Sequence, residues 1–376
     1  MAAQPYRSWV EVSLQRIAEN YQAVRAAVGP GVEVMGVVKT EAYGHGAVEV
    51  ARTLLALGAR WLAVTSVEEG VALREAGIPA RILVMADNLP YTRPALLEFD
   101  LTPVVHTLAD LGELNQLARQ AGRRIPFHLK IDTGMGRLGT RAGAAEIAAA
   151  LQEAAHMHLE GLMTHFASAA DYSASQTGQQ IQAFGEALGQ LRRAGVECAC
   201  VHASGTNPIA YGRRQAWHNM VRPGLALYGY VSPARGEAPP SILEVKPALT
   251  WKASVLVTKE QPEGALIGYG GLFRAPRPMR IAVIGAGYAD GVSHRLSNRG
   301  HVIAGGRLVR ILGAVSMDLT TIDVTECPSI QAGHAATLLG SEGQARLDAQ
   351  QIASTAGTIS YDVLCQIRAR VRRVYV

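Results

Sequence analysis

The 376-residue sequence predicts an α/β fold, namely a (β/α)8 TIM barrel followed by a mostly β C-terminal domain. Up to about residue 230, short apolar, β-branched runs alternate with longer segments that have the apolar period of helices, as in repeated βα units. The Pro- and Gly-rich stretch SPARGEAPPS at 232–241 ends this alternation. Beyond it, short β-rich segments are separated by turn residues. We therefore expect two domains, at 1–245 and 246–376.

The first of these parts contains eight strand candidates with the length and composition of buried strands. They are 34–38, 61–65, 81–85, 102–105, 127–131, 158–163, 199–202 and 220–227. Helical periodicity lies between them, at 45–58, 67–76, 107–121, 143–155 and 176–194. Eight parallel strands with intervening helices are the set that a TIM barrel needs, although Pro223 breaks the last candidate.

The second part reads as β structure with a helical ending. Its strand candidates are 249–259, 279–286, 300–304, 307–315, 319–325 and 334–339. A helical pattern follows around 348–368, and the chain closes on the strand RRVYV.

Composition excludes several classes of protein. Hydrophobic residues make up 48% of the chain and charged residues 18%, which excludes a disordered or coiled-coil chain. No window approaches the roughly 18 consecutive apolar residues of a membrane helix, and the first residues lack the apolar core of a signal peptide. We therefore expect a cytoplasmic protein without a membrane partner. Four arginines among the last nine residues nearly account for the net charge of +5, so we expect no nucleic-acid partner.

Lysine is rare, since only five of the 36 basic residues are Lys. Two of them, Lys39 and Lys130, follow or end apolar strand candidates of the barrel. A surface lysine at a strand end is the ordinary interpretation. A lysine retained there can instead form an imine or lose its proton, which arginine cannot do, and burial favours the neutral amine. Lys39 therefore suits a Schiff base with pyridoxal phosphate.

Other candidate residues also follow strands, where a TIM barrel places its active site. They are Tyr43, Arg137, His165, Ser204 and Arg222. The segments ASGT at 203–206 and RPGLALYG at 222–229 offer hydroxyls and backbone N–H groups to a phosphate, although each can also be an ordinary loop.

Two further patterns carry no function. IGAGYADG at 284–291 begins like a dinucleotide fingerprint, but its glycine spacing differs and no helical pattern follows it. The histidines show no metal-ligand spacing, so we expect no metal.

Taken together, the motifs resemble those of the bacterial alanine racemase family. They are VVKTEAYGHG, KIDTGMGRLG, THFA, VRPGLALYG, GYADG, SMD, TISYD and RVRRVY, in the family's order over nearly the whole chain. The resemblance implies a pyridoxal-phosphate enzyme that interconverts L-alanine and D-alanine and so supplies D-alanine for peptidoglycan. It also implies a homodimer. Broader racemisation of serine and alanine, and a pyridoxal-phosphate decarboxylase, are the alternatives.

The resemblance also implies residue roles. Lys39 holds the cofactor covalently and is the base on one face of the substrate Cα, and Tyr288 serves the opposite face. Arg222 lies against the pyridine nitrogen with His165 as its partner. Five residues match positions that bind the cofactor phosphate in the family: Tyr43, Ser204, Gly224, Leu225 and Tyr361. Arg137 and the Met317 backbone bind the cofactor's phenolic oxygen and the substrate carboxylate, and Lys130 matches a lysine that the family often carbamylates.

This sequence departs from the family pattern at one phosphate-binding segment. The family usually has an asparagine before its serine, whereas HASGT at 202–206 lacks it. Either Ser204 or Thr206 therefore remains a candidate for the phosphate ligand.

Overall fold

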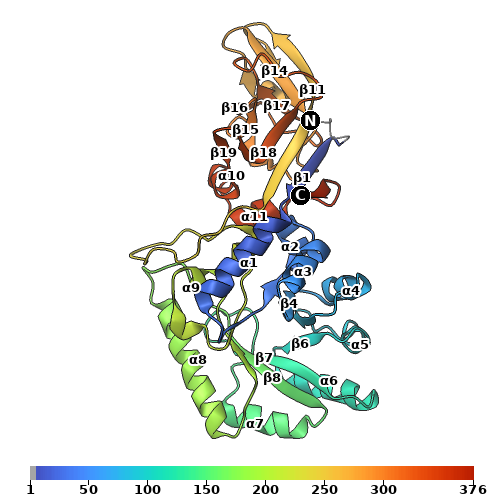
Figure 1. Cartoon of the computed structure of the whole chain (residues 1–376), viewed down its shortest axis with the longest axis vertical. Coiled ribbons are helices and arrows are strands. Elements are labelled where there is room, and N and C mark those ends of the chain that lie inside the picture. Colours follow the sequence, from blue (N-terminus) through green and yellow to red (C-terminus); the bar gives the residue numbers. More distant parts are fainter. Residues whose placement is uncertain (1–5) are drawn as a thin grey trace. The chain divides into compact units, whose positions relative to one another are not determined.

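The computed structural model describes residues 6–376, which form two compact units. The barrel unit comprises Ile17–Ala42 and Ala47–Lys246 (Figure 1). The C-terminal unit comprises the described residues up to Arg16, Tyr43–Gly46 and Pro247–Val376. The division after Lys246 lies one residue from the expected boundary, but two segments of the first 245 residues belong to the other unit.

The barrel unit is built on one parallel sheet in the order β2-β10-β9-β8-β7-β6-β5-β4-β3. Its strands are β2 (Glu33–Val34), β3 (Gly36–Val37), β4 (Trp61–Val64), β5 (Arg81–Val84), β6 (Thr102–Val105), β7 (Ile125–Lys130), β8 (Met157–Met163), β9 (Cys200–His202) and β10 (Met220–Val221). Strands β2 and β3 are two halves of one strand separated by Met35, whose N–H donates to the Val221 carbonyl. Because this strand pairs with β10 on one side and β4 on the other, the barrel closes with the eight predicted strands.

One helix precedes the first barrel strand, and the others follow barrel strands. The helices are α1 (Leu14–Val28), α2 (Lys39–Gly44), α3 (Ala47–Ala56), α4 (Val67–Glu75), α5 (Arg93–Glu98), α6 (Leu108–Gln120), α7 (Ala144–Glu153), α8 (Gln176–Arg193) and α9 (Thr206–Ala210), with short 3₁₀ turns η1 (Arg214–Ala216) and η2 (Leu225–Tyr228). Local signals set several starts. Ser66 and Glu69 form a capping box on α4, and the Thr107 hydroxyl caps α6.

The eighth predicted strand, 220–227, was too long. Only Met220–Val221 is a strand, and Leu225–Tyr228 is a 3₁₀ turn. Pro223 has no backbone N–H donor, so the strand ladder stops there and the chain turns across the end of the barrel.

The C-terminal unit is mostly β. Its main sheet has the order β19-β18-β15-β16-β17-β14-β11-β1-β20, with a further pairing of β18 with β11. The strands are β1 (Ser8–Val12), β11 (Leu249–Gln261), β12 (Leu266–Ile267), β13 (Phe273–Arg274), β14 (Met279–Ile284), β15 (His301–Ala304), β16 (Arg307–Leu312), β17 (Thr320–Asp323), β18 (Ala335–Glu342), β19 (Ala345–Leu347) and β20 (Arg372–Tyr375). The helices are α10 (Ala349–Ala356) and α11 (Ser360–Cys365), with 3₁₀ turns η3 (Tyr269–Gly271) and η4 (His294–Leu296). Each of the six expected strand regions contains a strand.

Strand β1 explains why the N-terminal segment belongs to this unit. It pairs antiparallel with β11 and parallel with β20.

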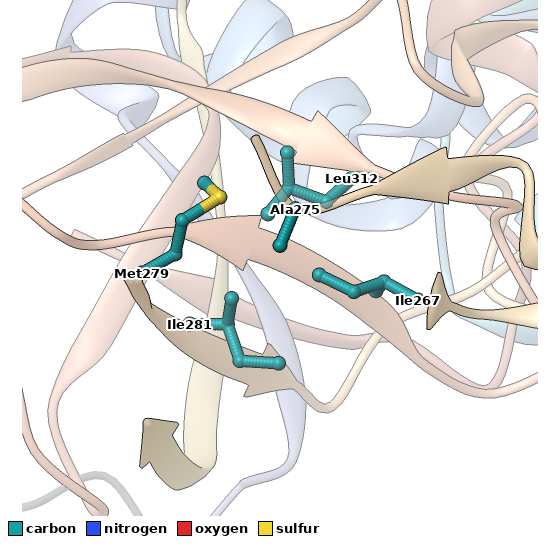
Figure 2. Close-up of a cluster of buried hydrophobic side chains, with 5 residues drawn as sticks. All are labelled: Ile267, Ala275, Met279, Ile281 and Leu312. Carbon is teal, nitrogen blue, oxygen red and sulfur yellow. The ribbon is translucent and has the colours of Figure 1, made fainter. Parts of the chain in front are cut away.

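A cluster of buried apolar side chains packs beside β14 and the short hairpin of β12 and β13 (Figure 2). It consists of Ile267, Ala275, Met279, Ile281 and Leu312. No helix within residues 6–376 has the length and apolar character to cross a membrane.

Candidate active site

Lys39 begins a strained turn at the end of the first barrel strand. Residues Thr40–Tyr43 have φ values of 53°, 52°, 52° and 55°, which is left-handed backbone. For residues other than glycine this costs roughly 1–2 kcal/mol each. A Glu69 carboxylate oxygen accepts from the Thr40 N–H, and the Glu41 carboxylate accepts from the Ala47 N–H at 3.1 Å. Strained backbone persists only where surrounding contacts enforce it, and it is often found at functional sites. Here the contacts with Glu69 and Glu41 hold the backbone that carries Lys39.

Arg222 is buried, and both terminal nitrogens of its guanidinium make polar contacts. One lies 2.6 Å from His202 Nδ1, and the other donates to the carbonyls of Thr164 at 2.9 Å and Ala203 at 3.2 Å. The second nitrogen also lies 3.2 Å from His165 Nδ1. In the part of the chain that the structure describes, the guanidinium Nε–H has no acceptor, so it is left for a ligand. Burial lowers the pKa of Arg222 to about 10. Because this value is still well above neutral pH, the guanidinium is charged there.

His202 is a residue that the sequence-based prediction missed. Its only signal was its position at the end of a strand, directly before the ASGT segment. It is fully buried, and burial holds its pKa well below the ordinary value. A neutral ring can accept from Arg222, which a charged ring cannot.

His165 and Lys130 are also shifted toward their neutral forms. Burial, with the charges of Arg222 and Lys130, lowers the pKa of His165 to about 3. Burial, with the charges of Arg137 and Arg222, lowers the pKa of Lys130 to about 8. Arg137 itself is exposed in the glycine-rich loop that follows β7. These electrostatic couplings show that Lys130 on β7, His165 after β8 and Arg222 after β10 lie in one region.

Two hydroxyls near the predicted phosphate site differ in their contacts. Ser204 is buried and its hydroxyl donates to the Ala216 carbonyl at 2.7 Å. The Thr206 hydroxyl oxygen instead accepts from the backbone N–H groups of Gly224 at 3.3 Å and Ala226 at 3.1 Å. The Thr206 oxygen only accepts in these contacts, so its hydroxyl proton can be donated to a phosphate, whereas the Ser204 proton is donated to Ala216.

The remaining predicted residues belong to the C-terminal unit. Tyr43 and Tyr361 lie with their ring centroids 6.0 Å apart. The Tyr288 N–H donates to the Ser316 carbonyl at 3.0 Å, and the Ala289 N–H donates to the Met317 carbonyl at 2.9 Å. The loops that carry Tyr288 and Met317 are therefore bonded to each other. Both side chains are exposed, Tyr288 by 43% and Met317 by 55%.

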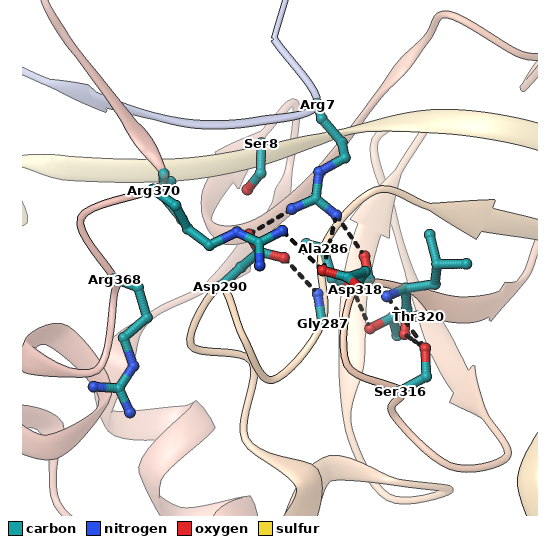
Figure 3. A network of polar contacts seen from close by, with 12 residues as sticks. Arg7, Ser8, Ala286, Gly287, Asp290, Ser316, Asp318, Thr320, Arg368 and Arg370 are labelled. Carbon is teal, nitrogen blue, oxygen red and sulfur yellow. Dashed lines mark hydrogen bonds and ion pairs between the residues drawn. The ribbon is translucent and has the colours of Figure 1, made fainter.

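A buried carboxylate clamps these two loops (Figure 3). Asp290 is 1% exposed and pairs with Arg7 at 2.8 Å and with Arg370 at 3.0 Å. Its second oxygen accepts from the Gly287 N–H at 2.9 Å. Arg370 also binds Asp318 at 2.8 Å, one residue beyond Met317. The sequence-based prediction did not single out this clamp, because its members lie far apart in the chain.

The approach of the two loops requires glycine at position 287. A Cβ there would lie 2.3 Å from the Ser316 carbonyl oxygen. Any side chain would therefore separate the loops that carry Tyr288 and Met317.

Within 6–376, no group of three or more His, Cys, Asp or Glu side chains is placed to hold a metal ion. The barrel unit combines a lysine at a fixed turn, a guanidinium whose Nε–H has no acceptor, neutral histidines and a hydroxyl that can donate to an anion. This combination suits an anionic, nitrogen-containing aromatic ligand.

Comparison with known proteins gives matches over nearly the whole chain. Family models described as the alanine racemase N-terminal and C-terminal domains match residues 12–233 and 248–375. The alanine racemase of Halothermothrix orenii is 38% identical over 98% of this chain and 96% of its own. The crystal structure of alanine racemase from D-cycloserine-producing Streptomyces lavendulae has a TM-score of 0.92 and 32% identity, covering 99% of this chain and 98% of that one. Alanine racemase from Bartonella henselae with covalently bound pyridoxal phosphate has a TM-score of 0.88 and 27% identity, covering 99% and 100%.

Proposed function

Because the chain belongs to the alanine racemase family, we propose that it interconverts L-alanine and D-alanine with two catalytic bases, Lys39 and Tyr288. The enzyme is an amino-acid racemase, and like the other members of its family it depends on pyridoxal phosphate. When bound, this cofactor supplies a conjugated electron sink for the charge that remains when the substrate Cα loses its proton.

The residues of the barrel mouth fit pyridoxal phosphate. The unpaired Nε–H of Arg222 suits the pyridine nitrogen, and the Thr206 hydroxyl, whose oxygen is held by the N–H groups of Gly224 and Ala226, suits the phosphate as a donor. The engaged hydroxyl of Ser204 favours Thr206 as the phosphate ligand. In this proposal the other phosphate contacts come from Tyr43, Leu225 and Tyr361, and Lys39 supplies the amine.

Inversion at Cα requires that a proton leave one face and that another arrive on the opposite face. We assign Lys39 to one face and Tyr288 to the other, and each positioned base contributes roughly 10²–10⁴-fold. Arg137 and the Met317 backbone hold the carboxylate. Arg222 donates to the ring nitrogen without giving up its proton, since its pKa of about 10 lies well above neutral pH. This restrains the decarboxylation and transamination that a protonated ring nitrogen favours.

We also propose that the active enzyme is a homodimer in which Tyr288 and Met317 act at the barrel of the partner subunit. Both side chains are exposed, by 43% and 55%, on loops that are hydrogen-bonded to each other, and neighbouring exposed apolar groups support an interaction surface. In this proposal the D-alanine is formed in the cytoplasm and serves peptidoglycan synthesis.

The position of Lys39 on a fixed left-handed turn, at the end of a barrel strand, is the observation that carries the assignment. Lys39→Ala is expected to abolish both covalent cofactor attachment, measured by absorption after dialysis, and racemisation, measured by chiral chromatography. Lys259→Ala is the matched control because Lys259 is an exposed lysine of the C-terminal unit. A Lys39→Ala enzyme that still racemises alanine would contradict the assignment, and carbon dioxide release by the wild type would indicate a decarboxylase instead.

A further inference from the structure

A line of polar side chains crosses the inside of the barrel and ends at Arg222. His202 Nδ1 lies 2.6 Å from the Arg222 guanidinium, and His202 Nε2 lies 2.7 Å from His128 Nδ1. His128 Nε2 lies 3.7 Å from Glu160 Oε2, and both oxygens of that carboxylate pair with Arg81.

These contacts pass through the barrel interior, because they join strands that are not neighbours in the sheet. Strand β8 separates β9, which carries His202, from β7, which carries His128. Strands β6 and β7 separate β5, which carries Arg81, from β8, which carries Glu160. The line therefore links the carboxyl ends of the strands to the first residues of β4 and β5, where Trp61 and Arg81 border a cavity of about 980 Å³.

The donors and acceptors along this line determine which nitrogen of each histidine carries a proton. Burial lowers the pKa of both His128 and His202, so each neutral ring has one proton. An arginine can only donate, so His202 Nδ1 accepts and the proton of His202 is on Nε2. His202 Nε2–H donates to His128 Nδ1, which leaves the proton of His128 on Nε2.

The His128 Nε2–H group then needs an acceptor. It is fully buried and, within residues 6–376, has no partner at hydrogen-bond distance; the Glu160 carboxylate faces it at 3.7 Å. An ionised carboxylate can only accept, so Glu160 is the kind of group that the His128 Nε2–H requires. Burial acts to raise the pKa of the Glu160 carboxyl, but contacts with His128 and Arg81 hold the pKa below its ordinary value, so the group is ionised.

The backbone of β8 places Glu160 and leaves room for the His128 ring. Leu159 pairs with Phe127 and Gly161 pairs with His128, so Glu160 is the extra residue of a β-bulge. A Cβ at Gly161 would lie 2.7 Å from the His128 ring. The bulge therefore directs Glu160, and the glycine leaves room for the imidazole.

We propose that Glu160 and His128 are positioning residues for racemisation: the carboxylate fixes the tautomer of His128, His128 fixes that of His202, and His202 thereby keeps a lone pair directed at Arg222. Without the carboxylate, both rings can move their protons to Nδ1, and the N–H of His202 then faces a guanidinium that also only donates. The effect on catalysis rests on the proposed function, whereas the tautomers do not.

Three variants test the proposal in the holoenzyme with isotope-labelled histidine rings. Long-range nitrogen–proton spectra are expected to show Nε2–H for both rings in the wild type and a mixture in Glu160→Leu. The kcat for L-alanine is expected to fall about tenfold in Glu160→Leu, with KM changed less than about twofold, because the charged acceptor that faces a positioning group is lost. Glu160→Gln keeps an acceptor oxygen and is expected to regain most of the loss. Glu33→Leu removes another Glu–Arg pair, with Arg60, at the same end of the barrel and is expected to change neither readout.

Histidines protonated on Nδ1 in the wild type, or unchanged spectra and kcat in Glu160→Leu, would overturn the proposal. If Glu160→Leu fails to fold, Gly161→Ala tests the same line while keeping the pair of Glu160 with Arg81. It is expected to shift the His202 signal and lower kcat, and a wild-type result would again overturn the proposal. A wild-type protein that does not racemise alanine contradicts the proposed function alone, since the spectra decide the tautomers independently.

Discussion

At the scale of single residues, burial decides which groups at the barrel mouth are charged. It lowers the pKa of His165 to about 3, of Lys130 to about 8 and of Arg222 to about 10. Near neutral pH, the histidine is therefore an acceptor and the arginine a fixed cation, while the lysine titrates close to the working range. Lys130 is the one of these three whose chemistry changes with a small change of pH.

This value for Lys130 supports its carbamylation, because only the neutral amine reacts with carbon dioxide. The positive charges of Arg137 and Arg222 that lower the pKa would also stabilise the negative carbamate. With labelled bicarbonate, we expect a carbamate carbon signal that grows as the pH rises through about 8, since protonated amine is lost over that interval. Lys130→Ala should lose the signal, and Lys259→Ala should keep it. A signal that survives in Lys130→Ala would place the carbamate elsewhere.

The sequence was informative for residues whose type is unusual at their position. Lys39 stands out because lysine is rare and because it follows an apolar strand, and Arg222 because it ends one. His128 and Glu160 lie inside strands, where nothing in the sequence indicates which way they point. The choice between Ser204 and Thr206 likewise depends on the direction of a hydroxyl toward Ala216, a contact that only the folded loop creates.

At the scale of elements, alternation of strands and helices was enough to predict the barrel, but non-local pairing was not predictable. The strand that begins at Ser8 has the same local pattern as a barrel strand, yet it pairs with β11 and β20. The left-handed turn in α2 is a second example. Its residues, TEAY, include no glycine that would signal positive φ, so the conformation comes from the contacts around it.

Strain in this turn gives a prediction for stability. Thr40 is exposed and β-branched at φ 53°, a conformation that costs roughly 1–2 kcal/mol for residues other than glycine. Thr40→Gly is expected to raise the free energy of unfolding by about 1 kcal/mol, measured by chemical denaturation followed by circular dichroism. We expect its kcat to fall, since the turn that fixes Lys39 becomes more flexible. Thr40→Ala keeps a Cβ and should change stability much less. Equal stabilisation by both variants would mean that the strain is not at this residue.

At the scale of the whole molecule, the candidate site residues are divided between two units. Lys39, Arg222 and Thr206, the proposed phosphate ligand, belong to the barrel unit, whereas Tyr288 and Met317 belong to the C-terminal unit. The clamp around Asp290 gives Tyr288 a fixed loop without covering its side chain. A homodimer that joins each barrel to the Tyr288 of the partner subunit would complete two equivalent sites, as closed two-fold symmetry requires.

Mixing two inactive variants distinguishes this arrangement from one in which each chain completes its own site. Lys39→Ala and Tyr288→Phe are each expected to be nearly inactive alone. If the bases come from different subunits, a mixed dimer contains one site with both substitutions and one site with neither. Unfolding and refolding an equal mixture should then restore about one quarter of the wild-type activity, because half of the dimers are mixed and each has one intact site. If both bases come from one chain, every site carries a substitution and the mixture stays inactive. Sedimentation of the same sample shows whether dimers have formed, so an inactive mixture of dimers would contradict the shared site directly.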